Sequence, residues 1–177
     1  MRYKPEQKKE THTRMVKAAG ESFREYGYGG IGVDGLAKAA DVTSGAFYKH
    51  FKSKSTAYAE VLESGLSEVV TAIEHFKAEH SEDWWKEFAK FYVGERRENP
   101  LANSCTLQSL SGETMRANES ARALFEIKLK EIIAVTGDNF DDAVVKISIL
   151  VGGVTLARAV NNPEFSDKIA TALANQF

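Results

Sequence analysis

The stretch that decides the fold is residues 40–54, ADVTSGAFYKHFKSK. Thr43 or Ser44 can cap a short helix at its start, because either hydroxyl can accept a hydrogen bond from a free backbone N–H of the first turn. Phe47 and Phe51 stand four residues apart, so both are expected on the inward face of that helix. The sequence therefore predicts a short helix with one aromatic, buried face and one glycine-bearing, basic face.

A second short helix is expected directly before this stretch, because apolar residues there follow the i, i+3, i+4, i+7 spacing of an amphipathic helix. These residues are Val33, Leu36, Ala37 and Ala40. Residues 41–43 are then long enough only for a turn. A first helix is expected from about Lys8 to Tyr26, ended by the glycine-rich segment 27–32. Two short helices joined by a tight turn and packed on such a helix make a helix-turn-helix.

The second helix of a helix-turn-helix enters the major groove of DNA, and the glycine-bearing face suits that use. Gly45 has no side chain to hold the helix backbone away from a duplex. Tyr48 offers a hydroxyl group and a flat ring, and Lys49, His50 and Lys54 offer hydrogen-bond donors to phosphate. The alternative is a three-helix bundle that happens to contain a basic short helix, with Tyr48 packed at its rim.

Charge is unevenly distributed along the chain. Residues 1–60 hold 11 Lys and Arg against 7 Asp and Glu, whereas residues 61–177 hold 12 against 18. A basic front on an acidic remainder is typical of an anion-binding head on a separate body. A solvated surface of no special function would also account for this excess.

Residues 14–54 resemble the TetR-type one-component repressors. The matching positions are Arg14, Ala18-Ala19, Phe23, Gly27, Leu36-Ala37, Ala40 to Gly45, Tyr48 to Phe51 and Ser53-Lys54. The resemblance implies an all-α fold of about nine helices that acts as a homodimer. It implies a helix-turn-helix DNA-binding domain over residues 1–52 and a ligand-binding and dimerisation domain over residues 53–177.

The resemblance also implies a set of DNA-binding residues. They are Thr43, Ser44, Gly45, Tyr48, Lys49, His50 and Lys54. Two departures from the family pattern bear on DNA contact: Gly32 stands where Ser or Thr usually caps the second helix, and Asp41 replaces the usual glycine of the turn. The first departure removes a side-chain contact to phosphate, and the second puts a negative charge near the duplex.

Helices are expected in the remainder of the chain at 82–98, 103–117, 119–136, 139–160 and 164–176. Between Val144 and Val160 the only charges are Lys146 and Arg158, so this helix must be covered on more than one side. We therefore expect residues 139–176 to pair with a second copy as a four-helix bundle. The alternative is a central helix buried within a monomer.

Residues 82–136 lie where the family places its effector pocket. The candidate ligand-binding residues are Trp84, Trp85, Phe88, Phe91, Tyr92, Cys105, Leu107, Met115 and Phe125. Aromatic residues at helical spacing also serve as ordinary core, and that alternative stays open for each of them. Cys105 is either a redox or electrophile sensor or a small buried apolar residue.

Catalysis, cofactors and metals are not expected. The histidines, His12, His50, His75 and His80, lack metal-ligand spacing, and no nucleophile elbow or carboxylate pair is visible. A single cysteine and no membrane-length apolar run indicate a cytoplasmic protein. The function expected is a repressor that binds a palindromic double-stranded DNA operator as a homodimer and is released by a small apolar or aromatic effector. The alternatives are an architectural DNA-binding protein without effector and a sensor that dimerises without DNA.

Overall fold

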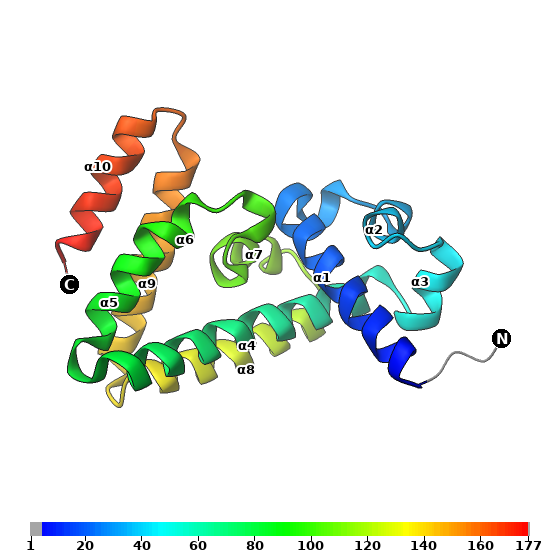
Figure 1. Cartoon of the computed structure of the whole chain (residues 1–177), viewed down its shortest axis with the longest axis horizontal. Coiled ribbons are helices and arrows are strands. Elements are labelled where there is room, and N and C mark those ends of the chain that lie inside the picture. Colours follow the sequence, from blue (N-terminus) through cyan, green and yellow to red (C-terminus); the bar gives the residue numbers. More distant parts are fainter. Residues whose placement is uncertain (1–4, 177) are drawn as a thin grey trace.

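The computed structural model describes residues 5–176, and all of their regular structure is helical (Figure 1). The helices are α1 (Pro5–Gly30), α2 (Val33–Ala39), α3 (Ser44–His50), α4 (Lys54–His80), α5 (Trp84–Val93), α6 (Glu95–Glu98), α7 (Thr106–Thr114), α8 (Glu119–Thr136), α9 (Phe140–Ala159) and α10 (Pro163–Ala174), with 3-10 turns η1 (Ser81–Asp83) and η2 (Leu101–Asn103). The all-α prediction is confirmed.

The first three helices form a head at one end of the molecule (Figure 1). Its core holds Met15 and Phe23 of α1, Leu36 of α2, and Phe47 with Phe51 at α3, all of them fully buried. The inward orientation predicted for the last two is therefore confirmed. This core holds α3 against α1 and α2 while leaving the opposite face of α3 open.

Helix α1 runs past the predicted end at Tyr26 and is kinked at Gly27. Gly27 has φ 73° and ψ 164°, a backbone conformation that side-chain-bearing residues rarely adopt. The predicted break is thus present as a kink, and the helix continues to Gly30 beyond it.

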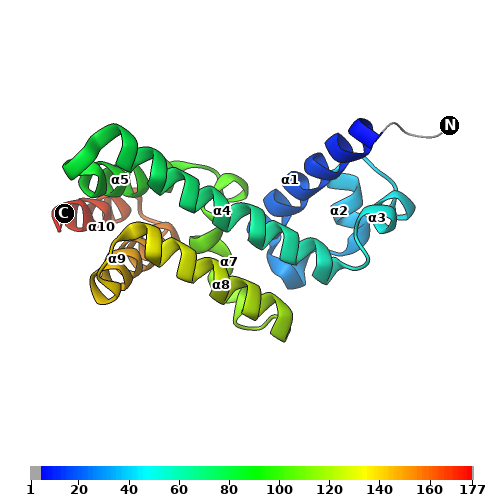
Figure 2. The ribbon, with the colours of Figure 1, turned by 90° about the horizontal axis from the view of Figure 1, so that it is seen from below.

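The long helix α4 joins the head to the body. The Ser53 side chain caps it by accepting a hydrogen bond from the Thr56 backbone N–H at 3.1 Å. Near its start α4 packs on α1, and further along it lies beside α8 (Figure 2). One continuous helix therefore contacts both the head and the body.

Helices α9 and α10 form the end of the body remote from α3 (Figure 1). They pack on each other closely at Gly153, where an added Cβ atom would overlap the Leu173 side chain. The neighbouring Gly152 faces the other way and has open space around it. The two adjacent glycines therefore serve different faces of α9.

The prediction of a single helix over residues 82–98 is wrong. The chain there divides into a 3-10 turn, α5 and α6, with a break at Gly94, whose ψ of −100° departs from helical geometry. The helix predicted over 103–117 is also shorter, at Thr106–Thr114. By contrast, α8 has the predicted bounds. None of the helices between residues 5 and 176 is both long enough and apolar enough to cross a bilayer.

Candidate nucleic-acid interface and ligand cavity

The open face of α3 carries the candidate DNA-binding residues. Thr43 caps the helix by accepting a hydrogen bond from the Ala46 backbone N–H at 3.1 Å. Gly45, Tyr48 and Lys49 face solvent, and Tyr48 has 57% of its surface exposed. A Cβ atom built on Gly45 would meet no atom nearer than the Thr43 hydroxyl oxygen, at 3.9 Å. The face is therefore open at its middle, as close approach to a duplex requires.

The turn between α2 and α3 is fixed by backbone and side-chain contacts. Asp41 adopts the left-handed conformation, with φ 54°, which aspartate tolerates better than most side chains. The Val42 N–H donates to the Ala37 carbonyl oxygen at 2.9 Å, and the Ser44 hydroxyl donates to a carboxylate oxygen of Asp34 at 2.5 Å. The latter bond also ties the Ser44 hydroxyl, a predicted DNA contact, to α2.

His50 and Lys54 are less open than the other predicted contacts. The His50 ring stacks on His12 of α1 with 5.5 Å between ring centres, and His12 contacts a carboxylate oxygen of Glu60 at 2.6 Å. Burial lowers the pKa of His50, and the nearby His12 and Lys8 lower it further. The Lys54 ammonium lies over the Tyr28 ring, 4.4 Å from its centre. Both side chains border the face rather than project from it.

Polar contacts join α1 to the body. Arg24 donates from Nε to the carbonyl oxygen of Ala102 at 2.6 Å and from a terminal nitrogen to the Thr106 hydroxyl at 3.2 Å. The Tyr28 N–H donates to a carboxylate oxygen of Glu113 on α7 at 3.0 Å. The head is therefore held by side chains as well as by α4.

The body contains a mostly apolar cavity of ≈ 220 Å³ that opens between α4 and α5. Its lining residues are Gly65, Glu68, Val69, Ala72, Phe88, Phe91, Tyr92, Arg96 and Cys105. Four of the predicted ligand-binding residues are thus brought together here: Phe88, Phe91, Tyr92 and Cys105.

The other five predicted ligand-binding residues lie elsewhere. Trp85 and Leu107 are buried in the core, and Trp84 packs at its edge. Met115 and Phe125 line a separate, open depression between α7 and α8. The structure therefore does not gather the nine residues around one site.

Sequence reasoning missed the contribution of α4 to the cavity. Glu68, Val69 and Ala72 share one side of that helix, and Gly65 lies one turn earlier. The available signal in the sequence is the pair of small residues Gly65 and Ala72, seven positions apart on α4, since small side chains leave room between helices. Arg96 was also missed, because a charged residue near the end of the helix predicted over 82–98 is expected at the surface.

Tyr92 is the polar group deepest in the cavity wall, with 5% of its surface exposed. Its hydroxyl oxygen is enclosed next to the Cys105 thiol, which is a weak hydrogen-bonding group. Burial raises the pKa of Tyr92 well above its ordinary value, and the adjacent Cys105 thiol raises it further. Tyr92 is therefore a neutral hydroxyl at physiological pH.

Within residues 5–176, no three His, Cys, Asp or Glu side chains gather as a metal site would require.

The sequence of this chain is similar to known proteins over part of its length. Residues 15–61 match the family model described as bacterial regulatory proteins, tetR family. The transcriptional regulator AcuR from Cereibacter sphaeroides is 41% identical over 44 residues, which is 25% of this chain and 20% of AcuR. The family model thus matches the head and the start of α4, and the match to AcuR spans a fifth of that relative.

Solved structures extend the likeness in fold to nearly the whole chain. A TetR transcriptional regulator from Chloroflexus aurantiacus superposes with TM-score 0.80 at 21% identity, covering 96% of this chain and 95% of that one. The regulator FadR from Bacillus subtilis, in complex with stearoyl-CoA, superposes with TM-score 0.65 at 18% identity, covering 93% and 98%. At these identities the likeness shows the fold alone.

Proposed function

By residues 15–61 this chain belongs to the TetR family of bacterial regulatory proteins, and we propose that it is a ligand-responsive repressor that binds a palindromic DNA operator as a homodimer. We assign DNA binding to residues 1–52, and ligand binding and dimerisation to residues 53–177. The observation that carries this proposal is the open, basic face of α3, with its backbone accessible at Gly45.

The proposed DNA contacts divide by chemistry. Thr43, Ser44 and Lys49 lie at the start and on the open side of α3, where a recognition helix reaches base edges. Tyr48 carries its hydroxyl at the rim of that face, a position suited to phosphate. We assign His50 and Lys54 to contacts with the DNA phosphates as well. For this contact Lys54 must either leave the Tyr28 ring or reach a phosphate while it stays at the edge of that ring.

The outward face of α9 supports dimerisation. Val145, Ile149, Gly152 and Leu156 recur at helical spacing along it, and Leu156 has 63% of its surface exposed. Phe165 on α10 is also an exposed apolar residue, with 53% of its surface accessible. An apolar surface of this kind is stabilised by a partner, and a second copy would place two α3 helices on one face of a duplex.

A small apolar or aromatic effector would occupy the cavity beside α4. The FadR structure with stearoyl-CoA supports ligand binding within this fold. Because α4 continues into the head, an effector that tilts it would change the separation of the two α3 helices. A coupling free energy of about 1–3 kcal/mol would weaken operator binding roughly 5- to 150-fold. The cavity supports this proposal over an architectural DNA-binding protein, which needs no such space. We also propose that the protein is cytoplasmic, because that is where its operator DNA would be.

The test is fluorescence anisotropy with labelled duplexes at increasing salt concentration. If α3 and the start of α4 contact phosphates, the logarithm of the binding constant falls linearly with the logarithm of the salt concentration. The slope is then about −0.9 per phosphate neutralised. Tyr48→Ala should reduce affinity while sedimentation still reports a dimer. A flat salt response, or full affinity after that substitution, would contradict the proposal.

A further inference from the structure

The side chains of Ser44 and Asp34 form a hydrogen bond at the surface where α3 begins. Ser44 is the first residue of α3, and Asp34 lies in the first turn of α2. The Ser44 hydroxyl donates to a carboxylate oxygen of Asp34 at 2.5 Å, and the bond is exposed to solvent. Ser44 stands four residues before the exposed Tyr48, so the two share one face of α3. The bond therefore lies on the face that we assign to DNA.

The chemistry of the two groups fixes the direction of this bond. An ionised carboxylate only accepts hydrogen bonds, whereas a serine hydroxyl has one proton to donate and two lone pairs with which to accept. The Ser44 proton is therefore used on Asp34, and the Ser44 oxygen keeps its lone pairs. Hydrogen bonds to a charged acceptor are about twice as strong as neutral ones, so a neutral base competes poorly with Asp34 for this proton.

The neighbouring hydroxyl of Thr43 has the opposite assignment. Its oxygen accepts a hydrogen bond from the Ala46 N–H at 3.1 Å, and its proton bonds to no acceptor within residues 5–176. Thr43 can thus donate to a base or a phosphate, whereas Ser44 is left to accept. Two adjacent hydroxyls at the start of α3 therefore differ in the groups that they can recognise.

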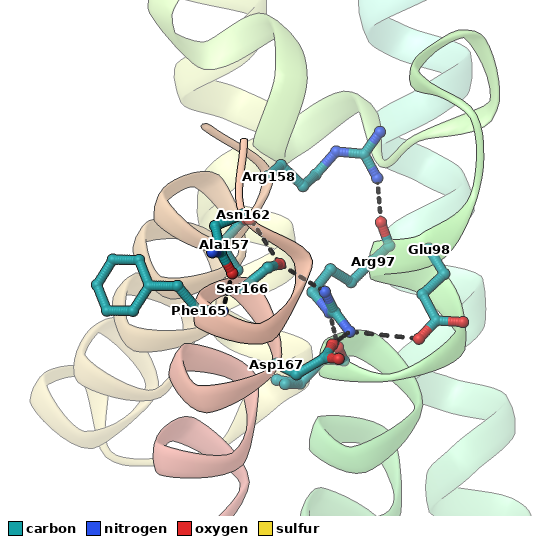
Figure 3. Close-up of polar contacts among 9 residues, drawn as sticks. Arg97, Glu98, Ala157, Arg158, Asn162, Phe165, Ser166 and Asp167 are labelled. Atoms are coloured by element: carbon teal, nitrogen blue, oxygen red, sulfur yellow. Dashed lines mark hydrogen bonds and ion pairs between the residues drawn. The ribbon is translucent and has the colours of Figure 1, made fainter. Parts of the chain in front are cut away.

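Ser166 in the body shows what binds a serine oxygen whose proton is already used (Figure 3). Its hydroxyl donates to the Ala157 carbonyl oxygen at 2.7 Å, and the same oxygen accepts from a terminal nitrogen of Arg97 at 2.7 Å. An N–H group thus occupies the open side of the oxygen. Ser44 has the first half of this arrangement, and no donor within residues 5–176 occupies the second half.

The Asp34 carboxylate makes this surface negative as well as hydrogen-bond accepting. Asp34 is exposed, and no Lys, Arg or His side chain in the described part of the chain, residues 5–176, forms an ion pair with it. A negative charge beside the Ser44 oxygen repels the acceptor atoms of a base edge and attracts its amino hydrogens. In the major groove these hydrogens belong to the N4 amino group of cytosine and the N6 amino group of adenine.

We propose that Ser44 reads the exocyclic amino group of a cytosine or an adenine in the major groove, and that Asp34 determines this choice by holding the Ser44 proton. Asp34 acts through Ser44 and is therefore a positioning residue. This inference rests on the proposed function, which it refines by naming the chemical group that one base reader selects. A serine hydroxyl without such a partner can donate or accept, so it would discriminate less between bases.

Affinities of the full-length protein for modified duplexes test the acceptor role. Selection from a random pool first supplies a bound duplex, and anisotropy with its single base-pair variants finds the pair whose identity matters less to Ser44→Ala. In that pair, cytosine is replaced by pyrimidin-2-one, or adenine by purine, each of which lacks only the amino group. The unsubstituted protein should lose affinity by roughly 5- to 30-fold, as for a lost base contact.

Ser44→Ala should lose less than about 2-fold on the same change, within the error of additive effects. Both proteins meet the same weakened base pair, so the difference between them reports the contact itself. An equal loss in both proteins would overturn the acceptor role. A loss that occurs only when a purine N7 is replaced by carbon would overturn it too, because Ser44 would then be a donor.

Asp34→Ala tests the positioning role. It frees the Ser44 proton, so the loss caused by deleting the amino group should shrink by about 3-fold or more, as for coupled neighbours. In the Ser44→Ala background it should not change that loss further. Asp41→Asn is the matched control, because it removes an exposed negative charge from the adjacent turn without touching the Ser44 bond.

The control should raise affinity for every duplex alike and leave the ratio between duplexes unchanged. An unchanged ratio in Asp34→Ala, or the same change in Asp41→Asn, would overturn the role of Asp34.

Failure of this inference is distinguishable from failure of the proposed function. If selection yields no bound duplex, the proposed function fails and this inference fails with it. If a duplex is selected and bound but Ser44→Ala changes no base preference, DNA binding stands and only the inference is overturned.

Discussion

The Nε of Arg24 on α1 lies 2.6 Å from the carbonyl oxygen of Ala102, three residues before Cys105 on the cavity wall. A terminal nitrogen of the same guanidinium reaches the Thr106 hydroxyl at 3.2 Å. The head and the cavity are therefore linked through the Arg24 side chain and residues 102–106. For the proposed effector, this contact would be a second path to the head besides α4.

Removal of this contact should destabilise the protein. Arg24→Met keeps the apolar stem and deletes both hydrogen bonds, so we expect the free energy of unfolding to fall by about 1–3 kcal/mol. Urea denaturation measures the change. Arg14→Met, at an exposed position on the same helix, should change it by less than about 0.5 kcal/mol. Equal effects of the two substitutions would show that the Arg24 contacts contribute nothing.

Gly45→Ala should separate folding from DNA binding. The added methyl group meets no close neighbour within the chain, and alanine favours a helix over glycine by up to about 1 kcal/mol. We therefore expect equal or higher thermal stability together with weaker binding to duplex DNA, measured by anisotropy. Unchanged DNA affinity would mean that α3 does not approach the duplex at this residue.

Leu156→Glu should produce a folded monomer. The side chain is on the outward apolar face of α9, and a carboxylate there would be desolvated against its own symmetry mate. Sedimentation equilibrium at micromolar concentration measures the mass. Ile127→Glu on α8, another exposed apolar position, should stay dimeric. A dimeric Leu156→Glu protein would place the interface elsewhere.

Stability should depend on pH through His50. Its pKa in the folded protein is below the unfolded value of about 6.5. The unfolded chain therefore binds the proton more readily, so stability is complete above about pH 6.5 and is lost as pH falls through the folded pKa.

Urea midpoints at pH 7.5 and 5.5 should differ less for His50→Gln than for the unsubstituted protein. His75→Gln, at an exposed histidine of α4, should retain the original difference. An identical pH response in the His50 variant would rule out this contribution.

The head is the part that the sequence predicts best. The i, i+4 pair Phe47 and Phe51, the hydroxyl cap and the three-residue turn each have a local physical cause, and all three occur in the structure. The start of α8 also has a local cause, because Asn118 caps its first turn. The Asn118 side-chain oxygen accepts a hydrogen bond from the Ala121 N–H at 3.0 Å.

The cavity could not be predicted in the same way. It is space left by small residues of α4 opposite aromatic residues of α5, and its shape depends on how the two helices pack. Trp84 and Trp85 stand close to Phe88 in the sequence, but the former two point into or along the core instead of the cavity. The break at Gly94 likewise depends on distant contacts, since Arg97 just beyond it is held by Ser166 and Asp167 of α10.

The central claim is that two α3 helices, paired through α9 and α10, read a twofold-symmetric duplex. The most direct measurement is selection of bound duplexes from a random pool, followed by native mass spectrometry of the protein with a selected duplex. We predict a palindrome with half-sites one helical turn apart, about 34 Å, or a multiple of it, occupied by two chains per pair of half-sites. Selected duplexes without twofold symmetry, or duplexes saturated by a single chain, would contradict the account.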